Sequence, residues 1–321
     1  MSKQNRTQTS ANRCRSRQAS QPNDAQIPAF KRPTNRDKEV WKAYWAQKQQ
    51  NWRIEPEIDE KRQRYLAERR NIMPNIEQGT YPFKNVQLKR ADIEWLLATH
   101  KHGDMQGPID WHDESQREHE GLDLRGADLH EVDLQNLPLA GLCGGLNRDE
   151  WCWYVHGEDG HKILSEAGVH LEQANLSGAH LEGTSLIGTF LVAVSVKNSY
   201  LNMASLNSVN GEKADFRGSH LEEADFADAY LEEASFGWAY MQKAIFSGAC
   251  LKRADFSETH LEGADFCQAN MELVNFTSAY LNKAILGAQP RDEIFEGPHL
   301  EGVCFFEAHL EGATLARLCT F

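Results

Sequence analysis

The chain has 321 residues, a formal net charge of −13 and 40% apolar residues. It contains no run of eighteen apolar residues, which excludes a membrane-spanning helix, and its first residues lack an apolar core, so we expect no secretory signal. Its seven cysteines are an odd number, widely spaced and without a CxxC pair, so we expect reduced thiols in a cytoplasmic setting.

The charge is unevenly distributed along the chain. Residues 1–120 carry 22 Lys and Arg against 17 Asp and Glu, whereas residues 121–321 carry 12 against 30. Within residues 1–36, eight basic side chains accompany a single acid, Asp24, and large apolar residues are almost absent. We therefore expect residues 1–36 to form a disordered basic tail.

Three roles are open for this basic tail. Its basic side chains could contact phosphates, could neutralise acids elsewhere in the chain, or could simply be solvated. They are Arg13, Arg15, Arg17, Lys31, Arg32 and Arg36. No aromatic residue is interleaved with basic ones before Phe30, which argues against recognition of bases. We favour the solvated tail and do not expect it to contact nucleic acid.

Residues 37–119 are predicted to form a helical N-terminal cap region. Apolar and aromatic residues at helical spacing favour three helices, over 37–52, 56–72 and 89–100. Pro and Gly residues separate the second helix from the third and end the third one.

Residues 120–142 contain the first turn of a repeat. Leu124, Leu129, Leu134 and Leu139 follow one another at intervals of five, and each is preceded two positions earlier by another apolar residue. We therefore assign one coil of a repeat structure to this segment.

Residues 143–168 interrupt the interval of five and are predicted to form a non-repeat insertion. They hold Cys143, Cys152, His156 and His161, which are residue types that bind zinc, in the spacing C-x8-C-x3-H-x4-H. This spacing matches no recognised zinc finger. The interpretation that we prefer is an aromatic lid over the coils with the thiols packed inside.

The main repeat is assigned to residues 169–286. From Leu171 to Leu286 every fifth residue is apolar except Gly211, and the residue two positions before each one is small or β-branched. An α-helix would scatter these positions around its axis, and a flat strand would send them to alternate faces. All of them can be buried only if the chain turns a corner every five residues, which makes a solenoid.

The central positions also indicate how many corners complete one coil. From residue 216 to residue 281 Phe alternates with Leu or Met, so the true period is ten, and like residues stack only if a coil holds an even number of five-residue units. Two units leave no interior and six leave a hollow tube, so packing density favours four units per coil. Phenylalanines then form two ladders on opposite walls of a core that includes Leu171, Leu181, Phe216, Phe226, Phe236, Phe246, Phe256, Phe266 and Phe276.

The units carry a family resemblance, and it covers residues 120–142 and 169–315. They resemble the A(D/N)LXX unit of the pentapeptide repeat family, as in Ala127-Asp128-Leu129, Ala174-Asn175-Leu176, Ala214-Asp215-Phe216 and Ala264-Asp265-Phe266. The resemblance implies an all-β solenoid, a right-handed quadrilateral β-helix with four pentapeptides per coil, in a bacterial protein. Gly211 at a central position, and Ile245 and Ile285 where a polar residue is usual, depart from the pattern.

The C-terminal part, residues 287–321, is predicted to be an interruption followed by one last coil in shifted register. Its centres are Leu300, Phe305, Leu310 and Leu315. The rod then has about eight coils, and at roughly 4.8 Å per coil it is about 38 Å long.

Solenoid ends expose unpaired backbone groups and need caps. The N-terminal helices are expected to cap the first coil. The other end could be covered by a homodimer joined through the C-terminal coil, or by an apolar plug formed by Leu318 and Phe321. The two alternatives are equally compatible with the sequence.

One outer wall is predicted to carry a ladder of rings. Six residues that precede central positions recur every twenty residues and should stack along this wall: His180, Tyr200, His220, Tyr240, His260 and Tyr280. They form either a pH-sensitive or aromatic docking stripe, or merely consensus residues that cover a sheet. We favour the second interpretation, because duplication of a ten-residue unit explains the pattern alone.

The acidic surface of the rod invites comparison with DNA. Residues 121–321 carry 30 acids against 12 bases, whereas about 38 Å of duplex DNA carries roughly 22 negative charges. The resemblance implies that some family members look like DNA and bind a type II topoisomerase, DNA gyrase, protecting it from quinolones. The alternative is that the acids keep the rod soluble.

No catalytic motif accompanies the repeats: the sequence has no Walker loop, GxGxxG, HExxH or GxSxG. We therefore expect a non-enzymatic protein without a cofactor, a protein-interaction scaffold of the bacterial cytoplasm that works through its outer ladders. The first alternative is a DNA-mimicking binder of gyrase. The second is a metal site in the 143–168 insertion.

Overall fold

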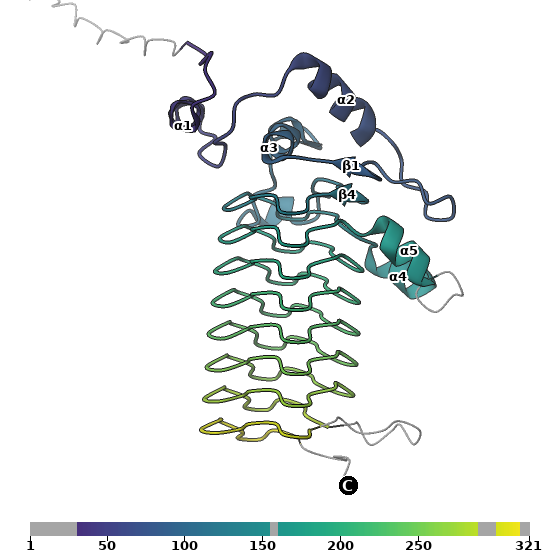
Figure 1. Cartoon of the computed structure of the whole chain (residues 1–321), viewed down its shortest axis with the longest axis vertical. Helices are drawn as coiled ribbons and strands as arrows, with labels where there is room; N and C mark the ends of the chain where they lie inside the picture. Colours follow the sequence, from purple (N-terminus) through teal and green to yellow (C-terminus); the bar gives the residue numbers. More distant parts are fainter. Residues whose placement is uncertain (1–30, 155–159, 288–299, 315–321) are drawn as a thin grey trace, which may run out of the picture.

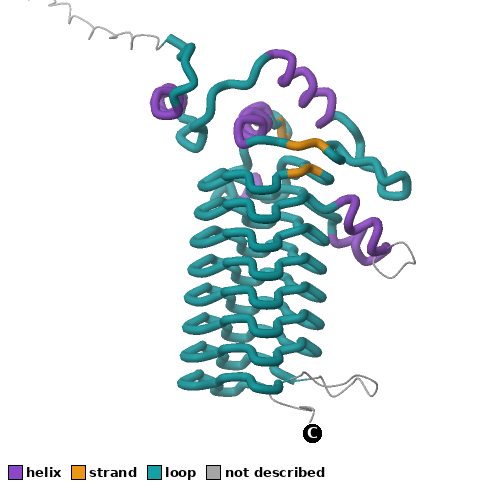
Figure 2. The backbone as a smooth tube through the Cα atoms, viewed as in Figure 1, coloured by secondary structure: helices purple, strands orange, loops and turns teal. Residues whose placement is uncertain are grey.

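A computed structural model describes residues 31–154, 160–287 and 300–314. The chain winds into a rod of stacked coils, with helices gathered at the end where the coils begin and the last described coil at the opposite end (Figure 1, Figure 2). The predictions for residues 1–30, and for Leu315, Leu318 and Phe321, concern segments outside the described residues.

Each coil of the main rod has four walls and twenty residues. We number the walls by their members in one coil: His170 stands in wall 1, Asn175 in wall 2, His180 in wall 3 and Ser185 in wall 4, and each wall continues every twenty residues as a parallel ladder. We call the residue that one coil contributes to a wall a rung of that wall. Each rung is held by two backbone hydrogen bonds of 2.6–3.2 Å to neighbouring coils. This right-handed quadrilateral β-helix confirms the fold class predicted from the period.

Stacked rings fill the interior of the rod. Phe216, Phe236, Phe256 and Phe276 form one ladder with ring centroids 4.7–5.3 Å apart, and it continues to Phe305 at 5.4 Å. A second ladder runs through 226, 246 and 266, and the two meet edge to face at 5.4–5.9 Å. All seven rings from 216 to 276 are fully buried, and both contact geometries are favourable for aromatic pairs.

The corners between walls explain the interval of five. The second residue after each central position adopts a left-handed backbone conformation, with φ near 60° at Gln173, Lys213 and Lys243 and glycine at other corners. This conformation turns the chain from one wall into the next, and it does not depend on the side chain. Gly211, in contrast, is a central residue, and the side chain of Leu231 on the next coil lies where its Cβ would point, so the departure from the repeat is local.

The N-terminal region contains three helices: α1 (Lys38–Gln47), α2 (Glu60–Arg70) and α3 (Arg90–Thr99). Helix α1 ends five residues before the predicted boundary, and α2 begins later than Pro56. Its start is fixed by Asp59, whose side chain accepts a hydrogen bond from the Arg62 backbone N–H.

A strand, as well as the helices, covers the first coil. Strand β1 (Val86–Gln87) pairs in parallel with β4 (Ala127–Asp128) of that coil, so wall 1 has a hydrogen-bonded partner at its first edge (Figure 1). The apolar side of α3 is buried in the same cluster as the core of the rod. A short antiparallel pair, β2 (Lys101–His102) and β3 (Met105–Gln106), and a 3-10 turn η1 (Glu114–Gln116) follow.

A buried ion pair on α3 joins the cap to the rod. The Glu94 carboxylate accepts from the Arg90 Nε at 2.8 Å and from two backbone N–H groups, of Ile54 and Glu55, at 3.0 Å. The Arg90 guanidinium in turn donates to the Asp133 and Gln135 carbonyls of the first coil. Both charges are thus hydrogen-bonded within the buried cap.

The insertion forms helices α4 (Arg148–Tyr154) and α5 (Gly160–Ala167), which project beside the first coils (Figure 1). Cys143 does not belong to it, contrary to the predicted boundary, because it is a rung of wall 4 that pairs with Asp123 and Ser185. At the far end Cys304 and His309 continue walls 2 and 3 after the interruption. In the described part of the chain, no helix is long and apolar enough to cross a membrane.

Replacing Phe246 by Ala should lower the free energy of unfolding by about 3–5 kcal/mol, because it leaves a cavity between two stacked rings and two edge-on rings. Chemical unfolding followed by circular dichroism measures this. The matched control is Phe306→Ala, at an exposed corner, which should change the stability by less than about 0.5 kcal/mol. A cost below about 1 kcal/mol for Phe246→Ala would contradict the packing described above.

Candidate interaction surfaces

Of the four candidate zinc ligands, the structure describes the side chains of two, Cys143 and Cys152. Cys143 stands in wall 4 and donates its thiol to the Gly145 carbonyl, and burial raises the pKa of this thiol to about 12, whereas Cys152 is exposed on α4. His156 and the side chain of His161 lie outside the described residues. Across the described ranges, no group of three His, Cys, Asp or Glu residues is placed to hold a metal ion.

Of the two described tryptophans of the predicted aromatic lid, one packs against the rod. Trp151 is half-buried against a cluster that includes Leu146 and Ile187, and its indole N–H donates to the Ser208 hydroxyl at 3.1 Å. Trp153 is exposed, and so is Cys152, so the expectation that the insertion buries both thiols is wrong. Trp151 contacts the rod while Trp153 and Cys152 are exposed, because α4 turns only one of its faces to the rod.

Wall 3 carries the predicted ladder of rings. His180, Tyr200, His220, Tyr240, His260 and Tyr280 stack with centroids 4.7–5.2 Å apart and ring planes within 9° of parallel, and the ladder continues to His309. Each ring therefore uses its faces against its neighbours on the adjacent coils. A partner would meet ring edges, namely tyrosine hydroxyls and imidazole nitrogens, and no open aromatic face.

Glutamates two residues further along the chain orient three of these histidines. The Nδ1 atoms of His180, His220 and His260 lie 3.0, 3.3 and 3.4 Å from the carboxylates of residues 182, 222 and 262. A carboxylate only accepts, so Nδ1 carries the proton and Nε2 faces outward. The bond to Glu182 raises the pKa of His180 above its ordinary value of 6.5, although partial burial opposes this.

The first rung of this ladder is partly covered by the cap. Residues 108–112 lie against wall 3 and line a small cavity together with His180 and Glu182. The His112 ring meets the His180 ring edge to face at 6.4 Å, and Trp111 lies against Gly183. The ladder from Tyr200 to His309 carries no such cover in the described structure.

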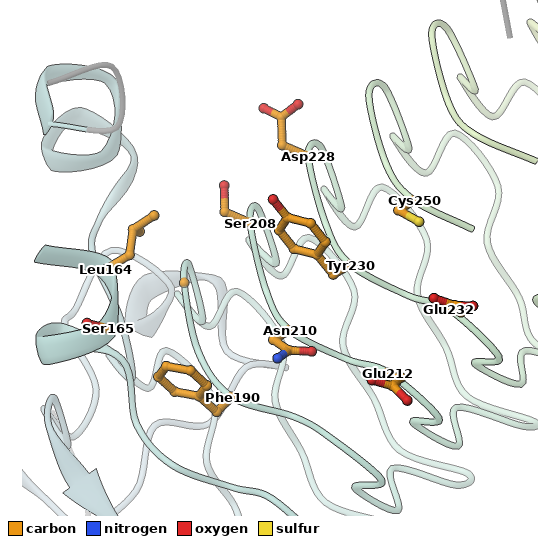
Figure 3. Close-up of a pocket in the computed structure, with 11 residues that line it drawn as sticks. Leu164, Ser165, Phe190, Ser208, Asn210, Glu212, Asp228, Tyr230, Glu232 and Cys250 are labelled. Atoms are coloured by element: carbon orange, nitrogen blue, oxygen red, sulfur yellow. The ribbon is translucent and has the colours of Figure 1, made fainter. Parts of the chain in front are cut away.

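A groove of about 700 Å³ lies between α5 and wall 1 (Figure 3). Figure 3 shows Phe190, Asn210, Tyr230 and Cys250 on successive coils along its floor. It is lined by Leu164, Ser165, Gly188, Phe190, Ser208, Asn210, Glu212, Asp228, Tyr230, Glu232 and Cys250. Because the neighbours of Tyr230 in the ladder carry no rings, its side chain is 58% exposed, against 38–40% for the wall 3 tyrosines.

The wall of the groove formed by α5 is firmly attached to the rod. The Arg125 guanidinium joins Asp123 of the first coil to Glu150 of α4, at 2.8 and 3.2 Å. Lys84 of the cap pairs with Glu166 at the end of α5, at 2.8 Å. With the Trp151 contact to the rod, these bonds hold α4 and α5 on two sides, so the groove exists without a partner.

Charged residues line the corner between walls 1 and 2, next to the groove. Lys213 pairs with Glu212 at 2.6 Å, Arg253 pairs with Glu232 at 2.6 Å and with Glu233 at 3.0 Å. Glu212 and Glu232 also line the groove. Each engages one cation and keeps free lone pairs on its carboxylate, so this side of the groove accepts hydrogen bonds from a partner.

Sequence reasoning did not single out the groove or a cluster of histidines in the cap. His102 is buried, its ring centroid lies 5.7 Å from that of His100 and 5.5 Å from that of His119, and burial lowers its pKa. The three share no recognisable spacing. The members of the groove floor do recur every twenty residues, but Asn210 and Cys250 replace rings there, so no aromatic ladder is visible in the sequence.

The geometry defines a β-helical solenoid with outward ladders. Residues 167–202, 212–248 and 249–287 match the model of pentapeptide repeats, in eight copies, so this part of the rod is built of pentapeptide repeats. A comparison with curated protein sequences finds no match.

Several solved structures are similar to the chain. HetL, a pentapeptide repeat protein involved in heterocyst differentiation regulation in the cyanobacterium Nostoc sp. strain PCC 7120, is 22% identical over 63% of this chain and 86% of its own, with a TM-score of 0.32. QnrB1, a plasmid-mediated fluoroquinolone resistance protein, is 17% identical over 56% and 77%, with a TM-score of 0.31. A pentapeptide repeat protein of the Arabidopsis thaliana thylakoid lumen is 29% identical over 36% and 71%, with a TM-score of 0.26.

Replacing Glu182 by Gln should lower the pKa of His180, because the carboxylate that favours the imidazolium is removed. The folded pKa lies above that of the unfolded chain, so the stabilisation from this pair is complete below about pH 6.5 and is lost as the pH rises through the folded pKa. An NMR titration of the His180 ring protons measures the shift. Glu222→Gln is the control and should leave His180 unchanged; equal titration curves for wild type and Glu182→Gln would contradict the assignment.

Proposed function

We propose that this protein is a non-enzymatic protein-interaction scaffold whose rod presents a preformed groove, between α5 and wall 1, to a segment of a partner protein. The observation that carries the proposal is the groove of about 700 Å³, whose floor carries the exposed ring of Tyr230. We propose a bacterial cytoplasm as its setting, on the resemblance of the repeat and the odd, widely spaced cysteines.

The parts of the rod that are accessible to a ligand support a scaffold role. Side chains fill the interior, since the central residues from Leu171 to Leu286 are buried. A ligand therefore has to bind outside, at walls and corners. Repeat rods generally bind partners through such extended surfaces.

The lining of the groove indicates the kind of segment it accepts. The rings of Phe190 and Tyr230 offer apolar area that is two coils apart, and Leu164 lines the groove from α5. Glu212 and Glu232 stand along one side (Figure 3). An extended peptide with apolar side chains spaced to reach both rings, and with a basic side chain facing the glutamates, would match this arrangement.

A photo-crosslinking amino acid at Tyr230 tests the proposal. Expressed in its native cytoplasm, this variant should form one dominant covalent adduct with a partner protein, because residue 230 lies on the groove floor. The matched control is the same amino acid at Trp238, which is 55% exposed but lies at the corner after wall 2, and it should not capture that protein. Adducts of the same pattern at both positions would contradict a groove-specific scaffold.

A DNA-mimicking binder of a type II topoisomerase is the second candidate. The observation that favours it is the net acidity of a rod of roughly the length of eleven base pairs. The corner between walls 1 and 2 weakens it, because Lys213, Lys252 and Arg253 are interleaved with its acids. A phosphate backbone has no such compensation, so we place this candidate second.

A gyrase supercoiling assay separates the two candidates. A DNA mimic should inhibit supercoiling, or protect gyrase from a quinolone, at micromolar protein, because it competes for the DNA-binding surface. The scaffold proposal expects no effect of either kind. Inhibition that is unchanged by the Tyr230→Ala substitution would support the DNA mimic and contradict a role restricted to the groove.

A further inference from the structure

Wall 3 alternates between two kinds of rung. One coil carries His and, two residues later, an acid, and the next coil carries Tyr and, two residues later, an amide in the same place. The six rungs beyond the covered one are Tyr200/Asn202, His220/Glu222, Tyr240/Gln242, His260/Glu262, Tyr280/Asn282 and His309/Glu311. The wall thus repeats every two coils in shape as well as in chemistry, since a tyrosine reaches further out than a histidine.

The exposed edges of these rungs are complementary to one another. In the rungs of His220 and His260, Nδ1 is engaged by glutamate, so the outward Nε2 accepts a hydrogen bond when the ring is neutral and donates one when it is charged. A tyrosine hydroxyl both donates and accepts, and it therefore pairs with either form. Two histidines in the same protonation state cannot pair, because both then only accept or only donate.

The same holds for the acids and amides of this wall. A carboxylate only accepts, and an amide nitrogen donates twice. Asn202 already donates to Glu222 on the neighbouring coil of the same chain. Oε2 of Glu262 and Oε1 of Gln242, in contrast, are buried without a hydrogen-bond partner in the described structure.

We propose that wall 3 binds wall 3 of a second copy of this chain, with the two rods antiparallel and a two-fold axis between the rungs of Tyr240 and His260. When the two-fold axis lies between two consecutive rungs, each tyrosine rung lies opposite a histidine rung of the second copy. Tyr240 then faces His260 of the second copy, His220 faces Tyr280, and Tyr200 faces His309. Long side chains thus meet short ones, and hydroxyls meet imidazole nitrogens.

The outer positions of the wall agree with this register. Gln242 faces Glu262 of the second copy, so an amide that donates lies opposite a carboxylate that accepts, and Glu222 faces Asn282 in the same way. At the corner, Glu223 faces Lys283, which are opposite charges. A parallel pair would instead set each rung against itself, with histidine on histidine and tyrosine on tyrosine.

The cap selects this register among the antiparallel ones. Residues 108–112 cover the rung of His180, and within the described residues the six rungs from Tyr200 to His309 are open. An axis between the third and fourth open rungs engages all six. At roughly 4.8 Å per rung the contact is about 29 Å long and polar, which corresponds to a small interface, so we expect a micromolar dissociation constant.

Sedimentation velocity of the full chain, from about 1 to 200 µM, tests the pairing. Wild type should show a monomer–dimer equilibrium, and Tyr240→Arg should weaken it at least tenfold, because it places a charge opposite His260 of the second copy. Tyr230→Arg is the matched control: it makes the same change one half-coil away, on the opposite wall, and should leave the dissociation constant unchanged. A wild type that stays monomeric, or a dimer that neither variant affects, would overturn the proposal, the latter outcome pointing to an end-to-end dimer through the C-terminal coil.

Distances between spin labels test the register and the direction. Labels on a noncanonical amino acid at Lys243 should lie about one rung apart along the rod axis in the dimer, whereas labels at Met203 should lie about five rungs, or roughly 24 Å, apart along it. Both corners carry exposed side chains, so the labels should not disturb the rod. Equal distances at the two positions would indicate a parallel pair and contradict the antiparallel register.

Discussion

The structure depends on the parallel hydrogen-bonded ladders that place residues twenty positions apart on top of one another. Each rung is joined to its neighbours by short backbone bonds, so identical positions of successive coils share one environment. Inside, this register brings phenylalanine onto phenylalanine at about 5 Å. Outside, it brings histidine onto tyrosine at the same spacing. The core and the surface of the rod are therefore two results of one constraint.

Much of the rod could be predicted from the sequence, because a strict period leaves few ways to bury its apolar residues. The two phenylalanine ladders and the stacked rings of wall 3 follow from the intervals of ten and twenty alone. Strand β1 could not be predicted in this way, since it has only two residues and is extended because the first coil offers it a partner. The assignment of Cys143 to the insertion was wrong because a single wall residue without a following unit carries no period.

The candidate surfaces were less predictable than the fold, for a physical reason. The ladder of wall 3 belongs to one wall, so its spacing is visible in the chain, but stacking consumes the ring faces, and only coordinates reveal that. The groove arises between α5 and wall 1, two segments without a common period. Its position depends on Arg125, Lys84 and Trp151, whose contacts link the insertion to the rod and the cap. Tertiary contacts of this kind leave no regular pattern in a single sequence.

The left-handed corners have a consequence for how such a rod changes over time. The residue at each corner is held by its backbone, and its side chain projects into water, so Glu, Lys, Met, Trp and Leu all occur there. Substitution at these sites leaves the buried stack untouched. The buried stack along the axis and the side chains at the corners can therefore change independently of each other. New binding specificities can evolve at the corners while the interior keeps its packing.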